Sequence, residues 1–447
     1  MPEKVVIIGG GVAGTNLAKK LVDKNRGFEI TLVKKETHAS YSPCGIPDVL
    51  SGKISGMESI LKDSLDNYLT KRGGTIKSGV RVTKLNINSK TVETDVGETL
   101  GFDVLVIATG RRPAIPKLNG IGLKGVYSLC DLEDSLRLYD ALREAERAVI
   151  IGAGPIGLEC ATAFRDQGIK TSLVEAKSHL LPGLLDEDMA GLVEAKLKAQ
   201  GVNIFTSEQV TEINGKDAVE SVRVNDSEIR ADLVLVATGI WPNSELAKEA
   251  GIEVGVNNGI LVDSRHRVIK DSQALADVYA LGDCVEVKNR ITGTYQLSPI
   301  VSTAVLASRI IAENICGEDI CLDSYLSPYI MVAGGLEIGA VGIISHQAEQ
   351  IGANIVIGKG SGHTKVNYYP EAKKMTVKLL SDREYLLGAQ IVGGEDVKER
   401  INAITGLIHL KVKVQDILQM ERCFTPSLCT SRDAFQRAVE ELLGVLA

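Results

Sequence analysis

The chain contains 447 residues, of which 44% are hydrophobic and only 4% aromatic, and its formal net charge at pH 7 is −7. This length suits roughly two to four domains, and so mild a charge argues against nucleic acid or an anionic membrane as a partner. No apolar run reaches the ~20 residues that cross a bilayer, and we expect no signal peptide before the first strand. The eight cysteines form no Cys-x-x-Cys pair, which indicates a reduced, cytoplasmic chain in which most cysteines are small core residues.

The chain begins with a predicted dinucleotide-binding unit. Residues 4–9 predict a buried strand, a Gly-x-Gly-x-x-Gly motif follows at 9–14, a helix extends to about residue 24, and residues 28–33 predict a second strand. In such a unit one glycine turns the chain, one admits the backbone to a pyrophosphate, and one lets helix and strand pack closely, while the helix N-terminus attracts the phosphate. The residues predicted to bind the dinucleotide are Gly9, Gly11, Val12, Ala13 and Gly14.

One position departs from the usual pattern of this unit. An acidic residue normally ends the second strand, where it holds the ribose hydroxyls. Lys34 occupies that position here, and Lys35 and Glu36 follow it. Either Glu36 substitutes for the acid or the adenosine end of the nucleotide is held differently, and Lys35 is included among the predicted cofactor-binding residues.

Residues 40–47, Ser-Tyr-Ser-Pro-Cys-Gly-Ile-Pro, follow this unit after a short loop and place Cys44 between two prolines. The residues after Cys44 predict the start of a helix, and a helix N-terminus lowers the pKa of an adjacent thiol. The thiolate is the form that attacks sulfur. Because no Cys-x4-Cys pair is present here, we expect Cys44 to cycle through a mixed disulfide, a persulfide or a sulfenic acid.

The dinucleotide-binding pattern occurs a second time. Residues 147–151 predict a strand, a second glycine motif follows at 152–157, a helix extends to about residue 167, and the strand at 170–174 leads into Glu175. A carboxylate at this position accepts from a ribose 2′-hydroxyl and repels a 2′-phosphate, which favours NADH over NADPH. The chain therefore binds two nucleotides, or one copy is a duplication that has lost binding. The predicted residues are Gly152, Gly154, Pro155, Ile156, Gly157 and Glu175.

Three further segments predict strands that end in polar or glycine residues. Residues 102–110 and 231–239 are near copies that end in Ala-Thr-Gly, and each precedes a proline, which suggests the places where the chain passes between domains. Residues 278–284 end in Gly-Asp, and a carboxylate there can accept from the ribityl hydroxyls of a flavin. A helix is predicted at about 302–314, with its positive N-terminal end available to a flavin ring. The cofactor-binding candidates here are Thr109, Gly110, Gly239, Gly282 and Asp283.

From about residue 324 the sequence predicts a different domain, of the α+β class. Strands are expected at 329–333, 339–343, 354–358, 375–380 and 387–392, and helices at 395–409 and 432–446. The predicted fold is thus α/β, with two Rossmann-like dinucleotide-binding domains and a C-terminal α+β domain that we expect to serve dimerisation. The predicted boundaries are 1–117 with 243–323 for the first dinucleotide-binding domain, which the resemblance described next implies to be the FAD domain, 118–242 for the second, which it implies to be the NAD(P)H domain, and 324–447 for the dimerisation domain.

The order of these motifs resembles that of the pyridine nucleotide-disulfide oxidoreductases. The loop around Cys44 resembles their single-cysteine branch, which includes the coenzyme A disulfide reductases, the persulfide reductases, and the NADH oxidases and peroxidases. The resemblance implies FAD in the first unit, NAD(P)H in the second, and a homodimer or a dimer of dimers. It also implies that Cys44 is the redox cysteine beside the flavin and that Glu159, in the second helix, lies near the nicotinamide.

The resemblance leaves several functions open. Val12 stands where the peroxidases carry a histidine that assists the sulfenic acid, which argues against a peroxidase. The favoured function is an FAD-dependent, NADH-linked reductase of persulfide or disulfide sulfur, with coenzyme A persulfide, a polysulfide or coenzyme A disulfide as substrate. The alternatives are an NADH oxidase that reduces oxygen and a non-enzymatic flavoprotein that senses NADH.

The substrate class rests on aromatic and basic residues. In the coenzyme A disulfide reductases, two tyrosine motifs from the partner's C-terminal domain meet the disulfide. Tyr368 and Tyr369 match the first motif, but Phe424 and Leu428 stand where tyrosines are expected in the second, which favours a smaller sulfur compound. The other predicted substrate-binding residues are Ser40 and Tyr41 and, if coenzyme A binds, the basic candidates Lys20, Arg26, Lys71 and Arg72.

Two further cysteines, Cys423 and Cys429, fall in the second of these motifs. They either relay or resolve a sulfur adduct or are ordinary buried thiols, and we favour the second interpretation. The remaining candidates for metal ligation lack suitable spacing, and no metal site is predicted: His363, His409, Cys316 and Cys321.

Overall fold

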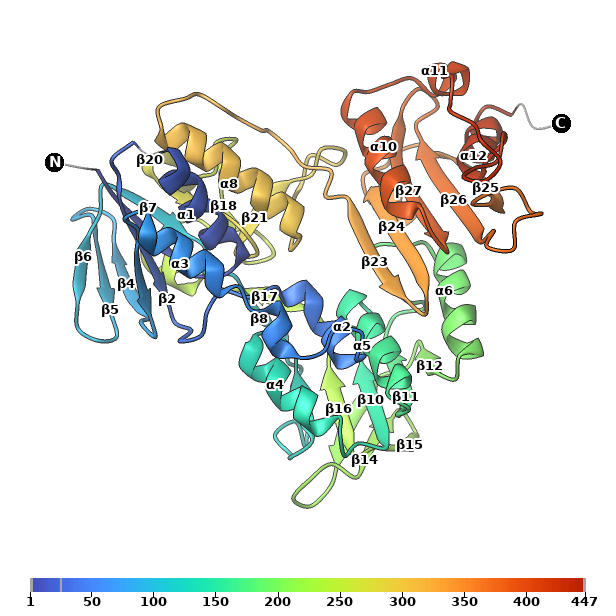
Figure 1. The fold of residues 1–447 in the computed structure, drawn as a ribbon, viewed down its shortest axis with the longest axis horizontal. Helices are drawn as coiled ribbons and strands as arrows, with labels where there is room; N and C mark the ends of the chain where they lie inside the picture. Colours follow the sequence, from blue (N-terminus) through green and yellow to red (C-terminus); the bar gives the residue numbers. More distant parts are fainter. Residues whose placement is uncertain (1–2, 25, 445–447) are drawn as a thin grey trace. The chain divides into compact units, whose positions relative to one another are not determined.

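The computed structural model describes residues 3–24 and 26–444, which form two compact units (Figure 1). Unit 1 comprises the described residues of Met1–Ile46, Ser55–Pro113 and Ile240–Ser327, and unit 2 comprises those of Pro47–Ile54, Ala114–Gly239 and Pro328–Ala447. The chain passes between the units at residues 46–47, 54–55, 113–114, 239–240 and 327–328. The crossings at 113–114 and 239–240 follow the two Ala-Thr-Gly segments, as predicted. Within the described residues, no helix is both long and apolar enough to span a membrane.

The central sheet of unit 1 consists of β1 (Lys4–Ile8), β2 (Glu29–Lys34), β3 (Thr75–Ser78), β7 (Val104–Ile107), β19 (Arg267–Lys270) and β20 (Gln273–Ala280). The strand order is β19-β20-β7-β1-β2-β3. β1 lies between β2 and β7 and pairs in parallel with both. All four residues of β7 are buried, as expected for a parallel strand covered on both faces.

Each face of this sheet has its own apolar core. On one face lie α1 (Val12–Lys24), α3 (Asp63–Lys71) and α8 (Val301–Ile315), whose Leu21, Leu69 and Ile311 share one cluster with the strands. On the other face lie β4 (Val82–Asn86), β5 (Thr91–Thr94), β6 (Thr99–Gly101) and α7 (Glu245–Glu249). The predicted strands and helices of this domain are therefore confirmed, with α1 ending at the predicted residue.

The shorter elements of unit 1 connect this sheet to its loops. β8 (Arg111–Pro113) pairs in antiparallel fashion with β17 (Ile240–Pro242), next to the crossings at 113–114 and 239–240. The helix predicted after Cys44 is present as α2, which begins in unit 1 and continues into unit 2. The remaining bounds are β18 (Ile260–Leu261), β21 (Val285–Lys288), β22 (Tyr295–Leu297), α2 (Ile46–Leu50) and the 3-10 helices η1 (Pro43–Gly45) and η2 (Met57–Ile60).

The first part of unit 2 repeats the parallel-sheet arrangement of unit 1. Its first sheet consists of β9 (Val126–Ser128), β10 (Arg147–Ile151), β11 (Lys170–Glu175), β12 (Asn203–Thr206) and β16 (Leu233–Val236), in the order β12-β11-β10-β16-β9. β10 pairs in parallel with β11 and β16, as β1 does with β2 and β7. The accompanying elements are α4 (Leu132–Ala141), α5 (Pro155–Asp166), α6 (Glu187–Ala199), β13 (Val210–Asn214), β14 (Ser221–Val224) and β15 (Ser227–Arg230). The second dinucleotide-binding fold predicted from the sequence is therefore confirmed.

The C-terminal part of unit 2 is an antiparallel sheet of β23 (Tyr329–Ala333), β24 (Leu336–Gly342), β25 (Val356–His363), β26 (Lys374–Ser381) and β27 (Leu386–Gly393), in the order β23-β24-β27-β26-β25. Its helices are α9 (Ser345–Gln350), α10 (Val397–His409), α11 (Val414–Gln419) and α12 (Ala434–Leu442). α12 packs closely on β25. A Cβ added at Gly360 of β25 would lie only 2.0 Å from the Ala434 oxygen of α12, so no larger residue fits there.

All five of these strands were predicted from the sequence, but some of their first and last residues differ from the prediction. The strand expected at 354–358 begins two residues later and extends to His363. α9 and α11 were not predicted. The helix predicted at 432–446 is observed as α12, and positions 445–446 of that prediction lie outside the described residues. The division into three domains stays a prediction.

Candidate active site

The first glycine turn, between β1 and α1, leaves an open backbone surface. Gly9 has φ +116°, and a Cβ there would lie 2.0 Å from the Ala108 oxygen, so only glycine fits. A Cβ on Gly14 would lie 2.1 Å from the Gly9 oxygen, so this glycine lets α1 approach the turn. A Cβ on Gly11, in contrast, would meet nothing within 4 Å. The free space is therefore at the N-terminus of α1, where a phosphate is favoured electrostatically.

Lys34 ends β2, in the position where the acid was expected, and its side chain is only 2% exposed. Its ammonium donates to the Asp66 carboxylate at 2.6 Å and to the His38 carbonyl at 2.9 Å. Glu36, the candidate substitute, lies 3.7 Å from the Lys35 ammonium. The buried Lys34 ammonium, paired with the Asp66 carboxylate of α3, thus stands in place of the usual acid at the end of the strand.

Asp66 also holds the segment that leads to Cys44. Its second carboxylate oxygen accepts a hydrogen bond from the buried Ser40 hydroxyl at 2.8 Å. The Lys62 amide donates to the Ser40 carbonyl at 2.6 Å. The loop before Cys44 is therefore tied both to α3 and, through Lys34, to the end of β2.

Cys44 is the central residue of η1, a single turn immediately before α2, and its thiol is exposed. Cys160 and Cys284, in contrast, are fully buried, and burial raises the pKa of each thiol, which makes it unreactive. The expectation that most cysteines are core residues is wrong: only these two are buried, whereas Cys321 and Cys423 are exposed like Cys44. The reason is that the exposed ones lie in turns and connections rather than inside sheets or packed helices.

Where β7 ends, polar groups of unit 1 form a hydrogen-bonded edge. The Thr109 hydroxyl donates to the Asn243 carbonyl at 2.5 Å, and the Asn243 amide returns a hydrogen bond to the Thr109 carbonyl at 2.9 Å. Just beyond β20, Asp283 accepts from the Arg111 Nε at 2.8 Å. Burial raises the pKa of Asp283, and Arg111 opposes that shift. Gly110 links these groups with φ +69°.

The second glycine turn, in unit 2, has the same geometry as the first. A Cβ on Gly152 would lie 2.5 Å from a backbone oxygen, whereas one on Gly154 would meet nothing within 4 Å. Glu175, buried at the end of β11, accepts from the Ala153 amide at 2.7 Å and from the Lys177 amide at 2.8 Å. The remaining predicted cofactor residues lie in the first turns of α1 and α5 or in the glycine segments after β16 and β20: Val12, Ala13, Pro155, Ile156, Gly157, Gly239 and Gly282.

Glu159 projects from α5, and burial raises its pKa to about 7. Asp48 adds to that shift and Lys53 opposes it. Both residues belong to the 47–54 stretch of unit 2, and their side chains are 3.4 Å apart. A carboxyl with a pKa near 7 can give or accept a proton at neutral pH. The stretch that follows Cys44 in the chain therefore helps to set the charge of Glu159.

Two surface segments predicted to meet substrate are joined in the C-terminal part of unit 2. The Val366 amide donates to the Pro426 carbonyl at 3.3 Å. On the first segment the rings of Tyr368 and Tyr369 lie 4.9 Å apart, and on the second segment the Phe424 side chain is 56% exposed. The structure thus joins, through this backbone hydrogen bond, the two segments that carry the expected aromatic motifs.

The other predicted substrate residues lie in unit 1. The Arg72 guanidinium sits 3.6 Å over the Tyr68 ring, in a cation–π contact at the end of α3. Tyr41 is partly buried, and its backbone bridges to Leu61. Of the further basic candidates, Arg26 and Lys71 are exposed and Lys20 is half-buried.

Sequence reasoning missed Asp66, Asp48, Arg111 and Asn243. None of them belongs to a motif with fixed spacing, and each reaches its partner through the packing of distant segments. Cys44 and Glu159 belong to different units. Among residues 3–24 and 26–444, no group of three or more His, Cys, Asp or Glu side chains is arranged to hold a metal ion.

The chain is similar to known proteins over nearly its whole length, both in sequence and in structure. The chain is 34% identical to an NADH oxidase of Methanocaldococcus jannaschii over 99% of both chains. It is 32% identical to a CoA-dependent NAD(P)H sulfur oxidoreductase of Pyrococcus abyssi over 94% of both. Its structure is similar to that of a NAD-dependent persulfide reductase from A. fulgidus, with a TM-score of 0.93 and 30% identity, covering 99% of this chain and 83% of that one.

The family comparison covers nearly the whole chain. Residues 3–307 match the pyridine nucleotide-disulphide oxidoreductase model, and residues 329–434 match the dimerisation domain of the same family. Both glycine turns and the C-terminal antiparallel sheet lie inside these matches. The chain therefore belongs to the pyridine nucleotide-disulphide oxidoreductases.

Proposed function

We propose that this protein is an FAD-dependent, NADH-linked reductase of persulfide or disulfide sulfur and that Cys44 is its redox cysteine. The observation that carries the proposal is the exposed Cys44 thiol on η1, at the end of a loop tied by Asp66 to the first nucleotide fold. The relatives named as a CoA-dependent sulfur oxidoreductase and a persulfide reductase support this substrate class.

The residues of unit 1 fit FAD. The open surface beside Gly11 can take the pyrophosphate, and the edge made by Thr109 and Gly110 can line the cofactor. Asp283, kept close to Arg111, can accept from the ribityl hydroxyls. When bound, FAD supplies two-electron transfer between NADH and sulfur. With Lys34 at the end of β2, the adenosine ribose would meet the Lys34–Asp66 pair instead of a strand-end carboxylate.

The first sheet of unit 2 fits NADH. Gly154 leaves room for the pyrophosphate at the N-terminus of α5. Glu175 is oriented by two backbone amides, so its remaining lone pairs can accept from ribose hydroxyls, and its charge disfavours the 2′-phosphate of NADPH. Glu159 on the same helix is proposed to contact the nicotinamide and to exchange a proton near neutral pH.

Cys44 performs the sulfur chemistry. Its thiolate attacks the outer sulfur of a persulfide RSSH, a new S–S bond forms as the old one breaks, and RS⁻ leaves and takes up a proton. Two electrons, which originate from NADH, and one proton then split the Cys44 persulfide into the Cys44 thiolate and hydrogen sulfide. The sum is RSSH, NADH and one proton giving RSH, hydrogen sulfide and NAD⁺.

The dimerisation domain of the family makes a homodimer the expected assembly. We propose that the segments carrying Tyr368 and Phe424 contribute to the substrate site, and that a bound coenzyme A would use basic residues such as Arg72 of unit 1. The three-domain division and the assignment of FAD and NADH to separate domains are part of the same proposal.

An NADH oxidase is the second candidate, because the relative at 34% identity over 99% of the chain carries that name. This activity needs oxygen to reach the bound flavin and does not need a sulfur substrate. A protein that only senses NADH would turn over neither oxygen nor sulfur.

The test compares NADH consumption by the purified holoenzyme with oxygen, hydrogen peroxide, coenzyme A disulfide and coenzyme A persulfide. Cys44→Ser should abolish the sulfur-dependent rates and leave flavin reduction by NADH intact. Cys321→Ser, which changes another exposed cysteine of unit 1, is the matched control. It should retain both the sulfur-dependent rates and flavin reduction by NADH. Sulfur reduction by Cys44→Ser at the parent rate would show that the proposal is wrong.

A further inference from the structure

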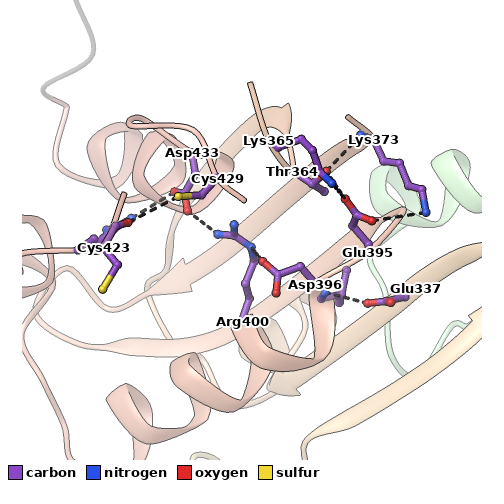
Figure 2. A network of polar contacts seen from close by, with 12 residues as sticks. Glu337, Thr364, Lys365, Lys373, Glu395, Asp396, Arg400, Cys423, Cys429 and Asp433 are labelled. Atoms are coloured by element: carbon purple, nitrogen blue, oxygen red, sulfur yellow. Dashed lines mark hydrogen bonds and ion pairs between the residues drawn. The ribbon is translucent and has the colours of Figure 1, made fainter. Parts of the chain in front are cut away.

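A loop in the C-terminal part of unit 2 is closed at its base by ion pairs. Asp433, just before α12, lies 3.2 Å from Arg422 and also accepts from Arg400 of α10. Its side chain is only 13% exposed, and it caps α12 by accepting from the Gln436 amide at 2.8 Å. Residues 422–433 therefore form a loop, here called the clasped loop, whose two ends are joined (Figure 2).

Two cysteines lie inside the clasped loop. The amides of Leu428 and Cys429 donate to the Thr425 carbonyl at 3.0 Å each, and the resulting turn brings Cys429 back toward Cys423. The Cys429 sulfur lies 3.6 Å from the Cys423 carbonyl oxygen and 3.4 Å from the Thr425 amide nitrogen. Cys423 is exposed and Cys429 is partly buried. Figure 2 shows the Cys423 sulfur pointing away from Cys429.

We propose that Cys423 and Cys429 are a redox pair that closes reversibly into a disulfide within one chain. A disulfide requires Cα atoms about 4.4–6.8 Å apart. The 3.6 Å contact between the Cys429 sulfur and the Cys423 carbonyl oxygen holds the two residues side by side across the turn. An exposed side chain changes rotamer readily, so closure requires the Cys423 sulfur to turn toward Cys429 and the backbone of the turn to adjust, while the ion pairs at the base of the loop stay in place.

The oxidant is a small disulfide, RSSR. The Cys423 thiolate attacks one of its sulfurs, forms a mixed disulfide and releases RS⁻; the Cys429 thiolate then attacks the Cys423 sulfur and releases the second RS⁻. Two protein thiols lose two electrons and two protons, and one small disulfide becomes two thiols. Exposure makes Cys423 the attacking residue, and the contact with the Thr425 amide holds Cys429 for the second step.

The consequence is a reversible lock on a surface that carries apolar side chains. Phe424 and Leu428 lie inside the clasped loop and are 56% and 71% exposed. A disulfide between positions 423 and 429 restricts the backbone that carries both side chains. The thiol–disulfide balance of small molecules would then set the mobility of this surface, by an exchange reaction that does not need the Cys44 thiol.

The experiment uses the holoenzyme with Cys44→Ser, so that failure of the proposed sulfur reduction does not affect the result. The protein is incubated with oxidised glutathione, remaining thiols are blocked with N-ethylmaleimide, and the peptides are identified by mass spectrometry. We expect Cys423 and Cys429 to be joined within one chain, without retained glutathione, and to reopen with reduced glutathione. Adding Cys429→Ser removes the resolving thiol, so the glutathione adduct on Cys423 should rise at least about tenfold.

Cys316 and Cys321 provide a matched control pair, because one of them is partly buried and the other exposed, but they follow the end of α8 instead of lying in a closed turn. They should retain separate adducts. A stable glutathione adduct on Cys423 while Cys429 is present would overturn the proposal. A disulfide between two chains, or equal closure of the control pair, would overturn it as well.

Discussion

The ion pair between Lys34 and Asp66 gives the sharpest quantitative prediction, because its two partners differ in burial. The Lys34 side chain is 2% exposed and that of Asp66 is 20% exposed. In Asp66→Asn the buried ammonium retains the His38 carbonyl at 2.9 Å but loses its counter-charge. In Lys34→Met the remaining carboxylate keeps the Ser40 hydroxyl at 2.8 Å and some access to water. Removing the acid should therefore be the more damaging change.

The magnitudes follow from the cost of an unpaired buried charge. Breaking a buried pair by removing one partner costs about 3–5 kcal/mol, whereas replacing both by neutral groups of similar volume is often nearly neutral. We expect Asp66→Asn to destabilise unit 1 by about 3–5 kcal/mol and Lys34→Met by about 1–3 kcal/mol. The double variant should be more stable than Asp66→Asn alone, by about 2 kcal/mol or more.

The assay is urea unfolding followed by the fluorescence of Trp241, the only tryptophan of the chain, which lies in β17 of unit 1. Each variant is measured with excess FAD and again without it, because ligand linkage separates lost cofactor affinity from lost intrinsic stability. Glu93→Gln is the matched control: the Lys84–Glu93 pair is exposed at 3.0 Å, and its loss should cost less than about 1 kcal/mol.

Two results would refute this reasoning. One is a double variant that is as unstable as the sum of the single variants, since it would show no coupling between positions 34 and 66. The other is a larger loss for Lys34→Met than for Asp66→Asn. A further readout is the rate of Cys44 alkylation, which should change in Asp66→Asn because Asp66 holds Ser40 in the loop before Cys44.

Glu159→Gln should remove a transition near pH 7 from the rate of flavin reduction by NADH, because burial raises the pKa of Glu159 to about 7; stopped-flow rates between about pH 5.5 and 8.5 test this, and an unchanged transition assigns it to another group. His266 is buried, and burial lowers its pKa from 6.5 to about 4. The unfolded chain therefore binds more protons in this range, and stability should fall by about 3 kcal/mol as the pH drops from 6.5 to 4. The Trp241 unfolding midpoint of His266→Asn should show less of this pH dependence, and an equal dependence contradicts the assignment. Glu175→Ala should raise the kcat/KM for NADPH relative to NADH, and an unchanged ratio removes the argument for a 2′-hydroxyl contact.

Local sequence determined the two nucleotide folds. Gly11 and Gly14 act within one turn of chain, on a strand and helix that are adjacent in sequence, so the pattern could be interpreted without a structure; the contact of Gly9 with the distant Ala108 oxygen became visible only in the fold. The repeat at 152–157 and the apolar strands 4–8 and 147–151 followed in the same way. The exposed position of Cys44 before a helix also agreed with the residues around it.

Only the tertiary structure decided how the charges around these folds are balanced. Lys34 finds Asp66 because α3 packs beside the end of β2, and the pKa of Glu159 depends on burial and on Asp48 from another stretch of chain. The exposure of Cys423 likewise contradicts the expectation of a buried thiol. Burial and charge pairing depend on which distant segments meet, and the spacing of residues along the chain does not contain that information.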